Sequence, residues 1–327
     1  MRRAVSLVSV LALFTGCASG DRVAGEPARL QIVTTVAPLT SIVAAVAGDR
    51  ADIAGLVPEG TNSHTFEPPP SAAARLAKAD VLFLNGLGLE DPTRELAEAS
   101  LSDSARTVLL GDLILDRDDY IFDFSFPRAG GRPNPHTWTD PPLAIDYAVE
   151  IETVLSHLDP EGADEYRANL DAFTDRAQLL DRAMRTASAT VPVRKLLTYH
   201  DAYAYFAETY DWEVIGAIQV SDFGEPKPGE VAALIRQVRE HRVPAIFGSE
   251  VFPSPVLEQI GREAGVRYVD TLRDDDLPGD PGDTEHSWLG LMRQNFITMV
   301  EALGGDAAPL VEVPLTPALP DDADYPQ

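Results

Sequence analysis

Short β-branched segments alternate with helical segments along most of the chain, and this alternation restricts the fold more than any other feature. In the first half we expect strands at residues 30–36, 51–57, 81–84 and 107–110, with helices at 38–46, 71–79 and 141–157. The alternation returns after Pro192, with strands expected at 195–199, 213–218, 244–248 and 266–269. Strands that alternate with helices favour parallel sheets covered by helices on both faces. We therefore predict an α/β fold with two similar lobes.

One long helical segment separates the two lobes. Asp159 and Pro160 are typical of a helix start, and no glycine or proline occurs between Ala163 and Ala187. Apolar residues recur there at steps of three or four, namely Tyr166, Leu170, Phe173, Ala177, Leu180 and Met184. We expect a rigid linking helix at 159–190 between an N-terminal lobe at 30–158 and a C-terminal lobe at 191–305. The tail at 306–327, rich in proline and aspartate, is expected to be disordered.

The first residues have the pattern of a lipoprotein signal peptide. A basic start precedes an apolar run at 4–14, which is too short to span a membrane, and Thr15-Gly16-Cys17 follows. These small residues resemble a bacterial lipobox. We expect a signal peptide at 1–16, a lipid on Cys17 and a tether at 17–29. The lipid alone would then hold the mature chain at the outer face of the bacterial cytoplasmic membrane.

The composition excludes some kinds of binding partner and some kinds of metal site. The chain has 26 Lys and Arg against 52 Asp and Glu, a formal net charge of −26, so nucleic acids and anionic membrane surfaces are poor partners. Cys17 is the only cysteine, which excludes an intrachain disulfide and a cysteine metal site.

Four side chains have the types and positions expected of metal ligands. Two similar segments, NSHTFEPPP and NPHTWTDP, place His64 and His136 on loops that prolines stiffen. His200 and Asp270 each follow an expected strand directly. Ligands of open α/β sheets collect at the carboxyl ends of strands, so these side chains can share one crevice. Three imidazoles and a carboxylate suit zinc, with manganese as the second choice.

Other acids and histidines near these positions have competing interpretations. Three aspartates follow Asp270 closely and could replace it as a ligand: Asp274, Asp275 and Asp276. Residues 274–285 partly imitate an EF-hand loop, but a proline at the fifth position favours a solvated acidic loop. We expect His157 and His241 at the surface and consider only a transient metal contact for His286.

These segments resemble the metal-binding lipoproteins of ABC-type zinc and manganese importers, the cluster 9 solute-binding family. The resemblance covers about residues 30–303 and is carried by the lipobox, NSHTFEP, NGLGLE, NPHTWTDP, YHDAYAYF, FGSEVFPSP, and VDTL followed by WLGLMRQN. It implies two α/β lobes joined by one long helix, with the metal between them. The implied ligands are His64 and His136 from the first lobe and His200 and Asp270 from the second. The resemblance also implies a monomer that delivers its metal to a permease with a cytoplasmic ATPase and has no catalytic residues.

The residue type at the third ligand position, His200, affects which metal the site prefers. Family members carry His or Glu there, and His200 favours zinc, whereas many zinc members also have a His-rich loop that residues 128–135 lack. Because binding needs neutral imidazoles, we expect affinity to fall as the pH drops through the histidine range near about 6.5.

Three other functions would fit parts of the sequence. A zinc hydrolase can use three histidines with an open fourth position, but no HExxH occurs and Asp270 would close the coordination. A lipid-anchored adhesin would bind its partner without metal. A haem or siderophore receptor would need an aromatic or arginine-lined cleft, which no motif supplies.

Overall fold

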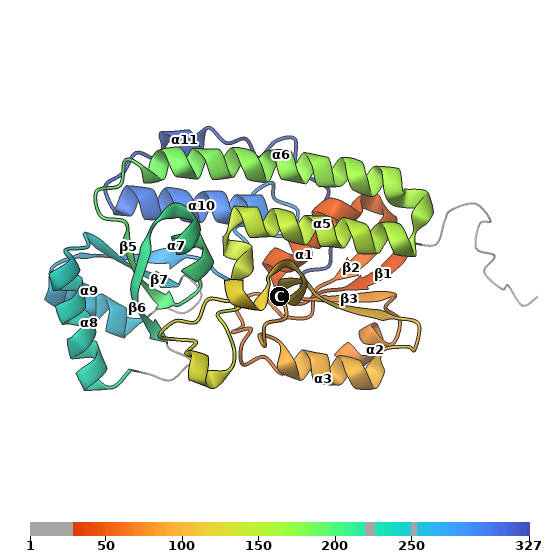
Figure 1. Ribbon diagram of the computed structural model, residues 1–327, viewed down its shortest axis with the longest axis horizontal. Helices are drawn as coiled ribbons and strands as arrows, with labels where there is room; N and C mark the ends of the chain where they lie inside the picture. Colours follow the sequence, from red (N-terminus) through yellow and green to blue (C-terminus); the bar gives the residue numbers. More distant parts are fainter. Residues whose placement is uncertain (1–28, 220–225, 250–253) are drawn as a thin grey trace, which may run out of the picture.

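A computed structural model describes residues 29–219, 226–249 and 254–327, so the expected signal peptide and Cys17 lie outside the described residues. The chain forms two α/β lobes that lie side by side, with long helices layered across them (Figure 1). The lobes are parallel-sheet structures flanked by helices, which confirms the predicted fold class.

The N-terminal lobe contains a parallel sheet of four strands in the order β2-β1-β3-β4. Their bounds are β1 Leu30–Val33, β2 Ala51–Ala54, β3 Val81–Leu84 and β4 Arg106–Leu109. Side chains alternate across the sheet, so Ile32 faces α1 and α5 while Val33 faces α2 and α3. The helices of this lobe are α1 Ala37–Ala47, α2 Ala72–Leu76, α3 Asp91–Ser100, α4 Leu110–Ile114 and α5 Pro141–Leu158.

The C-terminal lobe repeats this plan with two parallel strand pairs, β5-β6 and β7-β8, of which β5 and β7 are neighbours (Figure 1). The strands are β5 Lys195–His200, β6 Glu213–Gln219, β7 Ala245–Ser249 and β8 Arg267–Leu272. The helices are α7 Ala204–Tyr210, α8 Pro228–His241 and α9 Pro255–Ala264. A core of its own, centred on Leu197, Ile246 and Leu257, lies under α8 and α9.

The predicted long helix is α6, Ala163–Ser188. Its 26 residues span roughly 40 Å at about 1.5 Å per residue. The predicted stripe is buried at Tyr166, Phe173, Ala177, Leu180 and Met184. This stripe packs on α1, α5 and α10 (Trp288–Ala302), so α6 belongs to the main core rather than standing free between the lobes.

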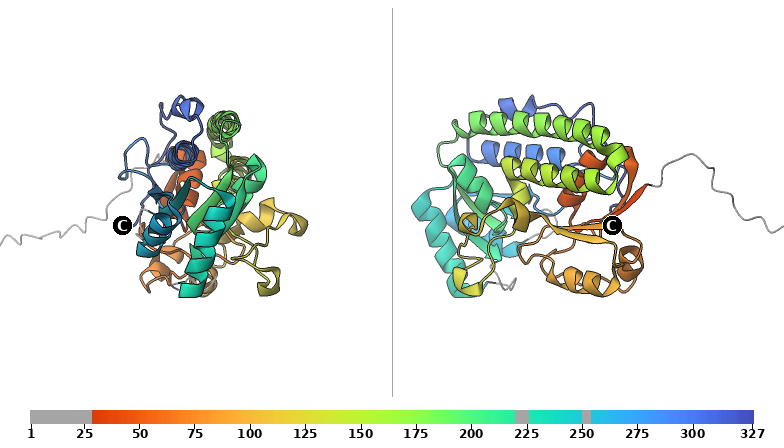
Figure 2. Two further views of the ribbon diagram at one scale, coloured as in Figure 1. Left: turned by 90° about the vertical axis from the view of Figure 1, so that its left-hand side faces the viewer. Right: turned by 45° about the vertical axis from the view of Figure 1, so that its right-hand side comes forward.

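The C-terminal tail is ordered, which contradicts the expectation of disorder. After α11 (Ala308–Val311) it returns to the N-terminal lobe, where Asp324 forms a parallel bridge with Ala54 of the edge strand β2. Figure 2 shows the C-terminus beside the strands of this lobe. Composition misleads here because Asp322 and Asp324 are exposed to water while Val313 and Tyr325 are buried. The unpaired edge of β2 supplies hydrogen bonds that composition does not reveal.

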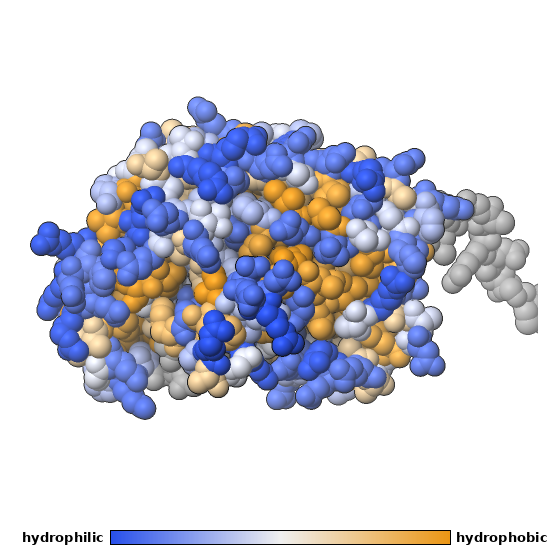
Figure 3. All heavy atoms as spheres, viewed as in Figure 1, coloured by the Kyte–Doolittle hydropathy of each residue, from blue (hydrophilic) through white to orange (hydrophobic). Residues whose placement is uncertain are grey.

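On the face shown in Figure 3, polar side chains predominate around the rim, and apolar side chains appear mainly in the middle. Within the described ranges, none of the helices combines the length and apolarity needed to cross a membrane.

Candidate metal centre

The structure brings three of the four predicted ligands together. His64 lies in the loop after β2, His136 in the loop before α5, and His200 is the last residue of β5. The Nε2 atoms of His64 and His136 are 3.0 Å apart, those of His64 and His200 3.1 Å, and those of His136 and His200 2.9 Å. His136 is fully buried and the other two are half-buried. The first lobe thus contributes two imidazoles and the second lobe one.

The two similar histidine segments share a local geometry. The backbone N–H of His64 donates to Asn62 Oδ1 at 3.0 Å, and that of His136 donates to Asn134 Oδ1 at 3.1 Å. Each segment is therefore an asparagine turn in which the side chain two residues earlier holds the histidine backbone. The repeated sequence pattern thus encodes a repeated way of presenting an imidazole.

A hydrogen-bond network determines which nitrogen of His136 carries the proton. Asn134 Nδ2 donates at 2.9 Å both to Asp123 Oδ2 and to the carbonyl of Asp201, which only accept. The other amide atom, Oδ1, is therefore an acceptor, and His136 Nδ1, 2.8 Å away, must donate to it. A neutral imidazole has one N–H, so Nε2 of His136 keeps a lone pair directed at the other two histidines.

The environment keeps all three imidazoles neutral. Burial lowers the pKa of His64 and His136 well below the usual value, and neighbouring imidazoles lower it further. Burial lowers the pKa of His200 to about 4. The neutral form that binds metal ions is therefore present well below pH 6.5, a lower limit than the sequence alone suggests.

Asp270 is not part of this group. It is an exposed residue inside β8, which continues to Leu272 because that residue still pairs with Ser249 of β7. We expected this strand to end at residue 269, which would have placed Asp270 directly after it. Because β8 ends at Leu272, Asp270 lies inside the strand instead. Beyond that exit, Asp274, Asp275 and Asp276 line a hollow together with His64 and His200. The carboxylates beside the histidines are thus the three that the sequence left as alternatives.

These three aspartates differ in their bonding. Asp275 accepts a hydrogen bond from Ser63, and burial, with the nearby charge of Asp274, raises its pKa to about 8. Asp276 Oδ1 accepts from the N–H of Gly60 at 3.0 Å. Asp274 lines both of the hollows that His200 lines, whereas Asp275 and Asp276 line only one of them.

Comparison with known proteins decides the family. The model of the zinc-uptake complex component A family, a periplasmic component, matches residues 32–302. The chain belongs to this family.

Named members of the family include metal-binding lipoproteins. The chain is 27% identical over 303 residues to the manganese-binding lipoprotein MntA of Halalkalibacterium halodurans, covering 91% of this chain and 97% of that protein. It is 25% identical over 309 residues to the manganese ABC transporter substrate-binding lipoprotein PsaA of Streptococcus pneumoniae, covering 91% and 98%. The solved structure of the periplasmic zinc-binding protein TroA from Treponema pallidum has a TM-score of 0.76 at 25% identity, over 84% of this chain and 99% of that one. The metals in these names differ, so membership does not identify the ion.

The NGLGLE segment, from Asn85 to Glu90, supports the second histidine loop. Asn85 Nδ2 donates to the carbonyl of Pro135 at 2.9 Å, directly before His136. Buried Glu90 accepts hydrogen bonds from Thr35 Oγ1 and from the N–H groups of Asn85 and Gly86, while burial raises its pKa to about 7. The sequence analysis used this segment only for the family resemblance, and its contact with the histidine loop became visible only in the structure.

The remaining histidines lie apart from the three-histidine group. His241 Nδ1 is 2.9 Å from Lys195 Nζ, and His157 is in the last turn of α5. His286 is 3% exposed and lines a separate cavity beneath the tail, so it is a buried residue rather than an accessible transient ligand.

Proposed function

We propose that this protein binds a divalent transition metal ion outside the cytoplasmic membrane and delivers it to an ABC-type permease driven by a cytoplasmic ATPase. The observation that carries the proposal is the convergence of three imidazole Nε2 atoms, pairwise 2.9–3.1 Å apart, from two lobes. Family membership supports transport rather than catalysis, because the named relatives include an ABC transporter substrate-binding lipoprotein.

The spacing of the nitrogens suits an ion bonded to all three. A triangle with these sides has its centre about 1.7 Å from each atom, and zinc–nitrogen bonds are about 2.0–2.1 Å long. An ion would therefore lie about 1 Å out of the plane of the nitrogens. We assign the fourth position to the carboxylate of Asp274 in place of Asp270, because Asp274 borders the histidines and Asp270 points into solvent from the interior of β8.

The donor set favours zinc. Three neutral imidazoles with one carboxylate are a nitrogen-rich set that suits zinc, whereas manganese prefers more oxygen ligands. The names of the relatives cover both metals. We therefore propose zinc as the ligand, with manganese as the alternative that a competition experiment decides.

The division of the ligands between lobes provides a mechanism for capture and release. His64 and His136 belong to the N-terminal lobe, and His200 and Asp274 to the C-terminal lobe. A bound ion stabilises the arrangement in which all four are close, and docking on the permease would favour one in which they separate slightly. Since α6 and α10 pack along both lobes in one core, we expect the movement to be small.

Lipid attachment at Cys17 and a monomeric state complete the proposal. Metabolic labelling with a fatty acid should label the natural chain and fail to label Cys17→Ser. Light scattering of the mature chain checks its oligomeric state.

The central experiment is a calorimetric titration of chelator-treated protein with Zn²⁺ and with Mn²⁺. We expect one equivalent of zinc to bind tightly, and His200→Ala to weaken binding by at least about a hundredfold. His157→Ala, which alters a histidine outside the group, should bind as the natural protein does. Metal binding unaffected by His200→Ala would contradict the proposal, and metal-dependent ester hydrolysis lost in that variant would favour the hydrolase instead.

A further inference from the structure

We propose that the last residues of the chain, Asp321–Gln327, form a clasp that positions the metal site by holding the loop of His64 against the loop of Asp274. The inference rests on the proposed function, since it concerns that same site. The clasp lies beyond residues 32–302, the part that the family model matches. Nothing in the family assignment accounts for it.

The clasp is fastened to the chain that leads from β2 to His64. The N–H of Asp324 donates to the carbonyl of Ile53 at 2.9 Å, and the N–H of Gly55 donates to the carbonyl of Asp324 at 2.9 Å. Further along, the N–H of Glu59 donates to the carbonyl of Pro326 at 3.1 Å. The tail is therefore bonded to this segment at the end of β2 and again at Glu59, five residues before the proposed ligand His64.

Glu59 connects the clasp to the opposite lobe. One carboxylate oxygen, Oε2, accepts from Gln327 Nε2 at 2.9 Å, and the other, Oε1, accepts from the N–H of Leu277 at 2.8 Å. Two more bonds join the same loops, from Gly60 N to Asp276 Oδ1 and from Ser63 Oγ to Asp275 Oδ2. The side chain of Glu59 thus links three segments: the clasp, the loop of His64 and the loop of Asp274.

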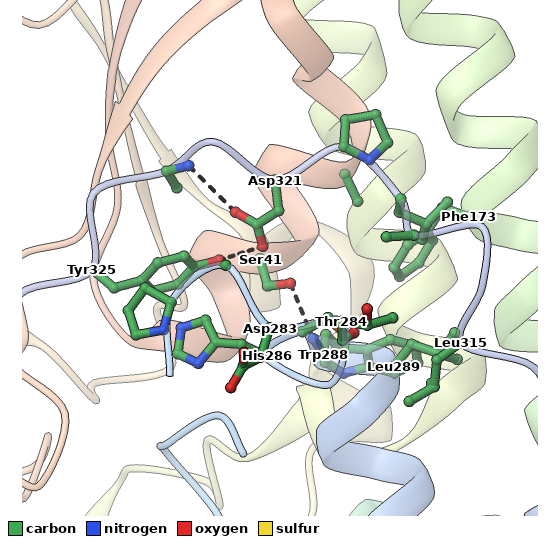
Figure 4. A pocket seen from close by; sticks show the side chains of 18 residues that line it. Ser41, Phe173, Asp283, Thr284, His286, Trp288, Leu289, Leu315, Asp321 and Tyr325 are labelled. Atoms are coloured by element: carbon green, nitrogen blue, oxygen red, sulfur yellow. Dashed lines mark hydrogen bonds between the residues drawn. The ribbon is translucent and has the colours of Figure 1, made fainter. Parts of the chain in front are cut away.

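The clasp is anchored by Tyr325, which is 7% exposed. Its hydroxyl donates to Asp321 Oδ2 at 2.6 Å, and its ring lies edge-on against that of His286, with centroids 4.7 Å apart. Figure 4 shows these side chains around a cavity of about 140 Å³ between the tail, α1 and residues 281–289. His286 belongs to the segment that joins β8 to α10, so Tyr325 also holds the far end of the acidic loop.

These contacts imply that loss of the clasp weakens metal binding. Without the clasp, the N–H groups of Gly55 and Glu59 and one oxygen of Glu59 would bond to water, and residues 55–63 would sample more conformations. The apparent dissociation constant rises in proportion as the fraction of molecules with His64 in place falls. In the bound protein the looser loop also lets His64 leave the ion more often, so we expect faster release of metal. The number of ligands stays the same, because the clasp itself contributes none.

The test compares mature protein ending at Ala323 with the full-length mature chain. We expect zinc to leave the shortened protein about five- to tenfold faster, measured by capture with a chromophoric chelator. Gln327→Ala removes the side-chain bonds to Glu59 and to the Tyr325 carbonyl and leaves the backbone bonds of the tail in place. It should give a smaller increase in the release rate, and it tests the proposal even if the shortened protein does not fold. The matched control is Arg176→Ala. It releases the start of the tail, whose Pro314 and Pro317 carbonyls accept from Arg176, but does not touch residues 53–60.

Hydrogen exchange of the metal-free proteins tests the clasp separately from the proposed metal-binding function. The clasp predicts faster exchange at residues 55–64 in the shortened protein, with α10 unchanged, whether or not the natural protein binds zinc. Zinc release within twofold of the natural rate, or unchanged exchange at 55–64, would overturn the clasp while leaving the three-histidine site intact. A full-length protein that binds no metal would instead overturn the proposed function, and the exchange result would still decide whether the clasp orders this loop.

Discussion

The indole nitrogen of Trp138 donates a hydrogen bond of 3.0 Å to the carbonyl of Asp274. Trp138 follows His136 by two residues, so this bond joins the histidine loop of one lobe to the acidic loop of the other. The carbonyl of Arg273, next to Asp274, accepts from Tyr203 and Asn295 at 2.6 and 2.7 Å. The backbone of the proposed carboxylate ligand is thus held from both lobes before any ion binds.

Trp138→Phe keeps an aromatic ring at this fully buried position but removes the indole donor and part of the buried volume. We expect the free energy of unfolding to fall by about 2 kcal/mol or more, from the lost hydrogen bond and the buried volume that the smaller ring does not fill, and zinc to dissociate several-fold faster. Urea denaturation and chelator capture measure the two effects. Trp212→Phe is the matched control, because its indole donates to Ser188 away from the site. It should cost similar stability without changing metal release, and equal release rates in the two variants would contradict the prediction.

The fourth ligand can be tested by two single substitutions. Asp274→Asn should weaken zinc binding by about a hundredfold or more, since it removes the only charge that we assign to the coordination shell. Asp270→Asn should leave the affinity unchanged within about twofold, because exposed β8 residues do not reach the histidines. Calorimetry of both variants checks this, and the reverse order of effects would restore the assignment made from the sequence.

The asparagine beside His136 should control metal affinity without touching the ion. Asn134→Leu removes the acceptor of the Nδ1 proton, so the tautomer with Nε2 free is no longer favoured. We expect zinc affinity to fall about ten- to a hundredfold. Nitrogen NMR of the metal-free protein should report loss of the Nδ1–H form at His136. An unchanged tautomer with weakened binding would show that Asn134 acts only through packing.

The lowered histidine pKa values predict how stability varies with pH. As the pH falls below about 6.5, His200 takes up a proton in the unfolded chain but stays neutral in the folded protein, where its pKa is about 4. The stability contributed by neutral His200 is therefore present above about pH 6.5 and is lost progressively as the pH falls towards 4.

His200→Asn isolates this contribution, because the buried carboxyl groups titrate in both proteins. Between pH 6.5 and 4, the metal-free natural protein should lose free energy of unfolding relative to the variant. Denaturant titrations at several pH values provide the measurement. A difference between the two proteins that stays constant over this range would be inconsistent with a buried neutral His200.

Local signals in the sequence were sufficient for the parts of the site that depend on short stretches of chain. The asparagine turns at His64 and His136 and the strand before His200 lie within a few residues of the ligands that they present. The helical period of α6 could also be predicted, because an amphipathic helix places apolar residues on its buried face at every turn. Only His200 ends a strand, while His64 and His136 lie on loops of the other lobe, so their meeting with His200 was an expectation from the two similar segments and the family resemblance.

The carboxylate and the tail required the tertiary structure. The strand β8 ends at Leu272 because it pairs with β7, so Asp274 rather than Asp270 emerges beside the histidines. The tail is ordered because the edge of β2 and the pocket for Tyr325 are available to it. Sequence alone determined the α/β alternation, the long helix and the three imidazoles, since periodicity and turn chemistry act between near neighbours. Tertiary structure decided the end of β8, the tautomer of His136 and the course of the tail, since each depends on hydrogen-bond partners distant in the chain.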